Sequence, residues 1–178
     1  MMRVSDFWPD ELNPTSLYVL SDQLELMQKI RKELLGQEQI DILQLSDILH
    51  IRTAEGKLIA MAPPFVEFYP ENVRIIPLPG DKPTPERLSI TVPILKDGIH
   101  RTWLAREEGV KIRCIVVSGA LAQHKPYAYP NSWDQVGVYE SKPENKKFYR
   151  RHNEYSYLRP LKALRQTGDA PPPPEWGR

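Results

Sequence analysis

Four residues near the middle of the chain have types and a spacing that point to phosphate chemistry. Asp97, Gly98, His100 and Arg101 lie in VPILKDGIHRTWLAREEG (92–109), where an apolar run is followed by a turn and then a helical pattern. Backbone N–H groups at the start of a helix lack intrahelical partners and favour an anion. Gly98 permits the turn and the close approach of a phosphate, which Arg101 can grip through two hydrogen bonds and His100 through a third. The spacing predicts a phosphate-binding turn formed by Gly98, His100 and Arg101.

Two other interpretations fit the same residue types. Asp-Gly is a common turn signal, and Asp97 is a residue type that caps helices, so this can be an ordinary helix start. Alternatively, Asp97 helps to hold Mg²⁺ near a phosphate, and with His100 and Arg101 forms the catalytic group of a nuclease or nucleotide hydrolase. The spacing alone does not choose among the three.

Positive charge is concentrated late in the chain. Residues 142–165 hold eight Lys or Arg against two Glu, a net charge of +6, whereas the rest of the chain carries −5. Aromatic side chains alternate with these cations, and nucleic acid offers phosphates to the cations and base faces to the rings. The alternative is that the aromatic residues, with Phe148 in the core, pack the segment onto the domain. The expected nucleic-acid-binding residues are Lys146, Lys147, Arg150, Arg151 and Arg159.

The helices that must position these groups are predicted from apolar spacing. Apolar residues recur every three or four positions over 21–36, which predicts an amphipathic helix with Asp22 and Glu25 as a capping box and Gly36 at its end. A shorter helix is expected over 99–107, and two helical pieces before and after Asn153. Ala105 is small enough to let the 99–107 helix lie close to a sheet.

Short aliphatic runs separated by turn residues predict the strands. The runs are 40–52 and 57–62 on either side of the turn TAEG, then 65–69, 73–78, 89–95 and 111–119. The chain holds 18 prolines, which remove ladder donors, so many of these segments, that of Pro93 included, are expected at sheet edges or in loops. The fold class expected is α+β (or α/β), a small mixed sheet with packed helices, an N-terminal helix and irregular Pro-rich insertions.

The domain organisation expected from these patterns is a single domain. It spans 1–165, with an N-terminal helical extension and the basic, aromatic C-terminal segment, and is followed by a flexible Pro-rich tail over 166–178. The 120–140 loop and this tail are the places where a protein partner would bind. No apolar stretch is long enough to cross a bilayer, so we expect a cytoplasmic protein with no membrane partner.

The sequence predicts neither a metal site nor a reactive cysteine. Cys114 is the single cysteine, which excludes an intramolecular disulfide, and it is expected to be a small buried hydrophobe within its strand. The four histidines are not spaced as metal ligands, so no metal site is predicted.

The turn and its flanking elements resemble the core of the ParB N-terminal-like and sulfiredoxin fold. The resemblance covers roughly residues 72–119, with the family's motif positions occupied by Asp97, Gly98, His100, Arg101, Ala105, Gly109 and Ile112–Val117. It implies a ParB/sulfiredoxin-like core with a nucleotide-phosphate pocket, in which His100 and Arg101 hold the phosphates of a nucleoside triphosphate, with Mg²⁺ as a further possibility. Sulfiredoxins carry their nucleophilic Cys directly before the His, where this chain has Ile99, so sulfiredoxin catalysis is excluded.

The resemblance and the residues together leave three functions open. The first is a ParB-like domain protein of prokaryotic type that binds nucleotide or nucleic-acid phosphate at the 97–101 turn and is associated with DNA. The second is a non-catalytic protein-interaction subunit that has kept the fold. The third is the Mg²⁺-dependent nuclease or nucleotide hydrolase. Which nucleotide is bound is not set by any residue pattern.

Overall fold

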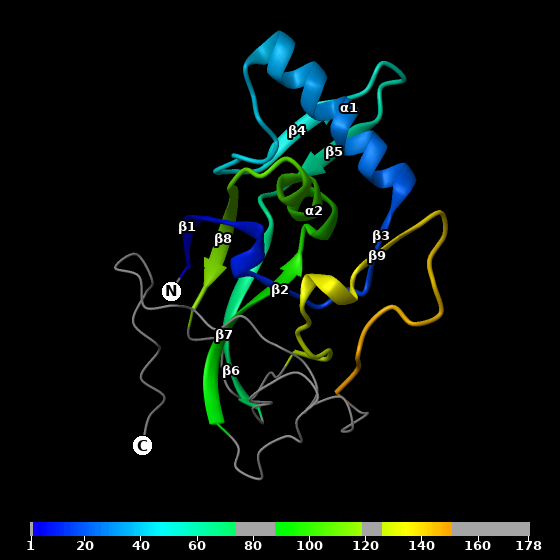
Figure 1. Cartoon of the computed structure of the whole chain (residues 1–178). Helices are drawn as coiled ribbons and strands as arrows, with labels where there is room; N and C mark the ends of the chain where they lie inside the picture. The colour runs from blue at the N-terminus through cyan, green and yellow to red at the C-terminus, as the bar shows by residue number, and fades with distance from the viewer. Residues whose placement is uncertain (1, 74–87, 119–125, 151–178) are drawn as a thin grey trace.

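The computed structural model describes residues 2–73, 88–118 and 126–150. Within these ranges the main sheet has five strands in the order β1-β8-β6-β7-β2 (Figure 1). The strands are β1 (Met2–Phe7), β2 (Asn13–Pro14), β6 (Phe65–Val73), β7 (Leu88–Asp97) and β8 (Ile112–Val117). The sheet is mixed, because β8 is antiparallel to β1 and parallel to β6, whereas β6 is antiparallel to β7. The predicted α+β class is confirmed.

The long β6–β7 pair forms the middle of this sheet. Its register runs from Phe65 opposite Asp97 to Val73 opposite Leu88, with an irregularity after Phe65. Pro93 lies inside β7, opposite Phe68. On its other side β7 pairs with β2 only at Ile94 and Leu95, so most of the strand is a sheet edge, as expected for a strand that contains proline.

The N-terminal strand β1 was not predicted. Its residues alternate in exposure as far as Phe7, which is the pattern of a strand with one covered face. It pairs with β8 along its whole length, from Met2 opposite Val117 to Phe7 opposite Ile112. The sequence MRVSDF is too polar to stand out as a strand, and β8, which was predicted as a buried strand, supplies its partner.

The first helix, α1 (Ser21–Glu38), agrees with the predicted helix but not with its predicted caps. The residue before it is Leu20, and no side chain caps the start, so the capping box of Asp22 and Glu25 is wrong. The Asp22 carboxylate instead accepts from the neighbouring Gln23 N–H, at 2.7 Å. The helix continues past Gly36 and ends at Gln39, which takes the left-handed conformation with φ 57°.

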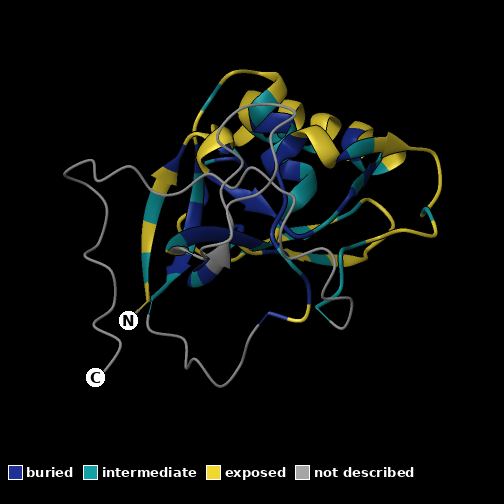
Figure 2. Cartoon of the chain, turned by 60° about the horizontal axis from the view of Figure 1, so that its bottom comes forward, coloured by how far each residue is buried: buried dark blue, intermediate teal, exposed yellow. Residues whose placement is uncertain are grey.

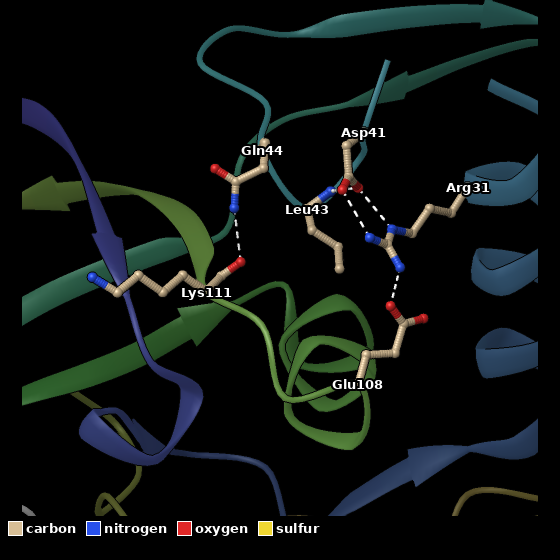
Figure 3. Close-up of polar contacts among 6 residues, drawn as sticks. All are labelled: Arg31, Asp41, Leu43, Gln44, Glu108 and Lys111. Carbon is tan, nitrogen blue, oxygen red and sulfur yellow. Dashed lines mark hydrogen bonds and ion pairs between the residues drawn. The ribbon is translucent and has the colours of Figure 1, made fainter. Parts of the chain in front are cut away.

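The loop after α1 is fastened to both helices by charge (Figure 3). Arg31 donates two hydrogen bonds to the Asp41 carboxylate, at 2.7 and 2.8 Å, and a third to Glu108 at the end of α2 (Ile99–Glu107). Burial raises the pKa of Asp41, but hydrogen bonds from Arg31 and from the Leu43 N–H outweigh it and hold that pKa below its usual value. This network ties the middle of α1 to the C-terminal end of α2.

The predicted strand over 40–52 is correct only at its end. Strand β4 (Leu49–Arg52) pairs with β5 (Leu58–Met61) around the TAEG turn, as predicted. Residues 40–48 form turns and loop instead, although Ile42 and Leu43 are fully buried in the core. Their burial explains the apolar pattern without a strand. The predicted run 73–78 lies almost entirely outside the described residues.

Helix α2 covers one face of the sheet and encloses the core with it. Leu104 and Ala105 of α2 pack with alternate residues of the strands, among them Val66, Phe68, Leu95, Ile112, Cys114 and Val116. Ala105 has no exposed surface, which confirms its expected close approach to the sheet. The inner strands of the main sheet, such as β6, are largely buried, whereas α1 turns an exposed surface outward (Figure 2). Four short elements complete the described fold: β3 (Tyr18–Leu20), which pairs with β9 (Gly137–Tyr139), and two 3-10 helices, Pro9–Glu11 and Trp133–Gln135.

Candidate functional site

The 97–101 turn links the end of β7 to the start of α2, as predicted. Gly98 is the residue before the helix and has φ 84°, a conformation that favours glycine. A Cβ atom at this position would lie 2.6 Å from Cβ of Pro64. Gly98 is therefore required by the turn and by the packing of Pro64 against it.

Asp97 does not cap the start of α2. The Gly98 carbonyl accepts from both the N–H and the side-chain hydroxyl of Thr102, each at 3.0 Å. Within the described residues, no side chain accepts a hydrogen bond from the N–H groups that begin α2. The interpretation of Asp97 as a helix cap is therefore wrong, and its carboxylate is left to act through its charge on the neighbouring His100 and Arg101.

Arg101 is a buried cation. Only 8% of the residue is exposed, and its Nη2 donates to the backbone carbonyl of Ala62. Its Nη1 is buried with no hydrogen-bond partner among the described residues, and the same part of the chain offers it no carboxylate at ion-pair distance. Burial lowers the pKa of Arg101, while the negative charge of Asp97 and the charge that Cys114 carries once its thiol ionises oppose this shift. A buried guanidinium with an unsatisfied N–H is a costly arrangement that an anion would relieve.

His100 has a structural partner. The N–H of Leu20, directly before α1, donates to its Nε2 at 3.0 Å. An accepting Nε2 means a neutral ring with its proton on Nδ1. Burial lowers the pKa of His100, against the opposing charges of Asp22 and Asp97. The sequence predicted that His100 donates a hydrogen bond to a phosphate, and only its Nδ1 is left to do so.

The described residues add no metal ligands to the predicted Mg²⁺-dependent hydrolase. Within the described ranges, no cluster of three or more His, Cys, Asp or Glu side chains is placed to hold a metal ion. Nε2 of His100 would have to release Leu20 before it could act as a base. A catalytic role for Asp97, His100 and Arg101 stays a prediction.

Cys114 is a buried residue of β8, as expected. It has no exposed surface, and burial raises the pKa of its thiol to about 12. The thiolate is the reactive form of cysteine, so this side chain is chemically inert at neutral pH.

The described part of the basic segment is not helical. Residues 148–150 run alongside 127–129, with hydrogen bonds from the Tyr129 N–H to the Phe148 carbonyl (2.7 Å) and from the Arg150 N–H to the Tyr127 carbonyl (3.0 Å). The helical piece expected before Asn153 is therefore wrong up to residue 150. Phe148 is only partly buried and does not belong to the core.

The predicted nucleic-acid-binding residues are divided by the structure. Lys146 is exposed, and Lys147 donates to the Tyr127 hydroxyl. Arg150 forms an ion pair with Glu71 of β6, so its charge is balanced within the domain. Arg151 and Arg159 lie outside the described residues, as does the tail over 166–178.

The structure also brings together an aromatic cluster that the sequence did not predict. Trp103 of α2 and Trp133 lie 6.0 Å apart, ring centre to ring centre, and the Arg106 guanidinium lies 5.9 Å from each. The Trp133 indole N–H donates to the Pro9 carbonyl at 2.8 Å. This cluster joins α2 to both ends of the described chain, and tryptophans far apart in a sequence give no signal that they meet.

A five-stranded mixed sheet with α2 packed against one face, and a glycine turn between β7 and that helix, define a small α+β domain. A model of the ParB CE domain family matches residues 2–137, which is more than half of the chain. The chain therefore belongs to the ParB CE domain family. No curated protein and no solved structure matches it.

The family match extends the predicted resemblance in both directions. The motif pointed to residues 72–119, whereas the match also takes in β1, α1 and the chain as far as Gly137. The ParB-like part of the prediction is confirmed, and the sulfiredoxin likeness and nucleotide binding stay predictions. The described helices include none that is long and apolar enough to cross a membrane.

Proposed function

We propose that this ParB-like domain binds a phosphate-bearing ligand, a nucleotide or a nucleic-acid phosphate, at the 97–101 turn and works in association with DNA. The observation that carries the proposal is the buried guanidinium of Arg101, whose Nη1 has no hydrogen-bond partner in the described chain. A phosphate oxygen beside it would supply both the missing acceptor and the missing negative charge.

The start of α2 adds to this site. The first N–H groups of a helix have no intrahelical acceptor and carry partial positive charge. Arg101 belongs to the first turn of α2, so its guanidinium and these N–H groups come from the same three residues of chain. The ligand must reach a side chain that is 8% exposed, so binding requires movement of the segment around Ala62, whose carbonyl holds the guanidinium.

Thermal denaturation with ATP, CTP, GTP and pyrophosphate, each with and without Mg²⁺, tests the site. A ligand at about 100 times its Kd stabilises the folded state by about 2.7 kcal/mol. For a chain of this size that is a rise in Tm of about 5–11 °C. Arg101→Ala should abolish the rise, because it removes the charged donor. Arg106→Ala is the matched control, since Arg106 lies on the same helix and is paired with Asp10.

The three functions separate by their outcomes. A nucleotide-dependent rise in Tm that Arg101→Ala removes supports the phosphate site. Mg²⁺-dependent turnover that His100→Ala removes would support the hydrolase instead. If no nucleotide, pyrophosphate or sulfate shifts the Tm of the wild type and it retains no DNA, the domain is an interaction subunit, with the 120–140 loop and the tail as the surfaces to test.

A further inference from the structure

Tyr127 is the aromatic side chain with the largest exposed fraction in the described chain, 60%. Its ring lies 6.2 Å from that of Tyr149, centre to centre, with the two planes inclined by 33°. The rings come from segments joined by a β-bridge between Ala128 and Tyr149. Two tyrosines from separate parts of the chain therefore form one aromatic surface patch, the Tyr127/Tyr149 patch.

The backbone beneath this patch is held on the sheet by Arg150. Its guanidinium lies 4.5 Å from the ring centre of Tyr129 and 5.6 Å from that of Tyr69, and it pairs with Glu71 of β6. The Arg150 side chain also donates to the Pro126 carbonyl. The side chains of Arg150 and Glu71 are only 17% and 7% exposed, so the pair is shielded from water. Exposed Tyr127 and half-buried Tyr149 thus stand on a base fixed by Arg150, which lowers the entropy lost when they bind a ligand.

Positive charge at the patch comes from two lysines. The Lys147 ammonium lies 4.7 Å from the centre of the Tyr127 ring, and Lys146 beside it is exposed. An exposed cation–π contact is worth about 0.5–1 kcal/mol. Lys147 also donates to the Tyr127 hydroxyl, so a phosphate bound by Lys147 replaces both contacts. Arg150 does not add to this charge, because Glu71 neutralises it.

Exposed aromatic rings next to lysines suit a nucleic acid whose bases are accessible. In a duplex the base faces are stacked on one another, whereas a single strand offers base faces to aromatic rings and phosphates to lysines. Tyr127 and Tyr149 already contact one another, so a base would stack on the outward face of Tyr127 and not between the rings. We propose that Tyr127 and Tyr149, with Lys146 and Lys147, form a stacking site for single-stranded nucleic acid. This inference deepens the DNA association proposed above and rests on it.

Fluorescence anisotropy with a labelled oligothymidine and a duplex of the same length tests the stacking site in the full chain. Loss of one base–aromatic stack costs about 1–3 kcal/mol, so Tyr127→Ala should weaken single-strand binding by about 5- to 150-fold. Its Tm should stay unchanged, because the side chain is 60% exposed. Tyr127→Phe keeps the ring and should bind like the wild type. Tyr139→Ala is the matched control, a tyrosine that is 44% exposed on β9.

The salt dependence of binding separates stacking from charge. Lys147→Ala should lower the slope of log K against log salt by about 0.7, the contribution of one phosphate contact on a single strand. Tyr127→Ala should weaken binding with the slope unchanged, because stacking releases no counterion.

Two results would overturn the stacking site. If the wild type retains duplex DNA but Tyr127→Ala binds the single strand as well as the wild type, the stacking site is wrong while the DNA association stands. If the wild type retains neither nucleic acid at low salt, both are wrong and the patch belongs to a protein partner. The nucleotide titration of the Arg101 site is independent of either result.

Discussion

Nε2 of His100, in the first turn of α2, accepts a hydrogen bond of 3.0 Å from the N–H of Leu20, the residue before α1. Among the described residues no side chain caps the start of α1, and this imidazole from another helix satisfies the N–H of the residue that precedes it. The same two helices are joined again by Arg31 and Glu108, at the other end of α2. Any ligand that moves the 97–101 turn therefore acts on α1 as well.

The first prediction concerns the effect of pH through His100. Burial lowers its pKa in the folded state, so below the unfolded value of about 6.5 the unfolded chain takes up a proton that the folded chain does not. The contribution of His100 to the free energy of unfolding is therefore fully present above pH 6.5 and is lost as the pH falls below it. His100→Gln keeps an acceptor for the Leu20 N–H but cannot titrate, so its urea midpoint should change less than that of the wild type between pH 7.5 and 5.5. Equal changes in both proteins would show that His100 does not cause the loss.

The second prediction concerns the Arg31–Asp41 pair. The two side chains are 16% and 22% exposed and share two hydrogen bonds, so Asp41→Asn should destabilise the fold by about 1–3 kcal/mol. Glu108 is 37% exposed, and Glu108→Gln should cost less than about 1 kcal/mol. Denaturant unfolding of both variants measures the difference. Equal losses would mean that the Asp41 bonds contribute no more than a surface pair.

The sequence could predict helix α2 but not the hydrogen-bond partners of the side chains on it. Helix α2 was predicted with its observed bounds, because a strand, a glycine turn and an apolar face are all local signals. The partner of Arg101 is a backbone carbonyl at Ala62, and that of His100 is a backbone N–H at Leu20. Every residue has backbone groups, so the sequence does not show which of them will bond to a given side chain. The motif therefore predicts the turn but not the hydrogen bonds that His100 and Arg101 form.

Contacts between residues far apart in the sequence also explain why only part of the predicted nucleic-acid-binding segment is free to bind: Lys146 is exposed, whereas Arg150 is neutralised. The residue types from 146 to 150 are those of a nucleic-acid surface, but Glu71, which neutralises Arg150, lies far away in the sequence on β6. Tyr127 was passed over because its loop lacks any periodic pattern. Only pairing between 127–129 and 148–150 brings that ring beside Tyr149 and Lys147.

The third prediction follows from the charge of Arg101, which has no carboxylate partner within residues 2–73, 88–118 and 126–150. Arg101→Met keeps a long apolar side chain but removes a buried cation with an unsatisfied N–H, which is worth roughly 1–3 kcal/mol. The Ala62 carbonyl that loses its donor belongs to an exposed residue, so water can replace the guanidinium. We expect the Tm of the ligand-free protein to rise by at least about 2 °C. A Tm that falls would show that Arg101 stabilises the fold without any ligand.

The last prediction contrasts two glycines of this chain. At Gly98 the backbone has φ 84°, and an added Cβ would lie 2.6 Å from Cβ of Pro64. A left-handed alanine costs about 1–2 kcal/mol, and the overlap with Pro64 adds about 1–3 kcal/mol more. Gly36 lies within α1, and an added Cβ there would meet nothing within 4 Å. Alanine is favoured over glycine inside a helix by about 1 kcal/mol, so Gly36→Ala should stabilise the protein.

Gly98→Ala and Gly36→Ala should therefore shift the Tm in opposite directions, with the larger shift at Gly98. The same Gly98→Ala protein also reports on the turn, because a displaced Pro64 moves the segment that includes the Ala62 carbonyl holding Arg101. If Gly98→Ala melts like the wild type, the close approach of Pro64 to this turn is wrong. The packing around Arg101, on which the proposed phosphate site depends, would then have to be redrawn.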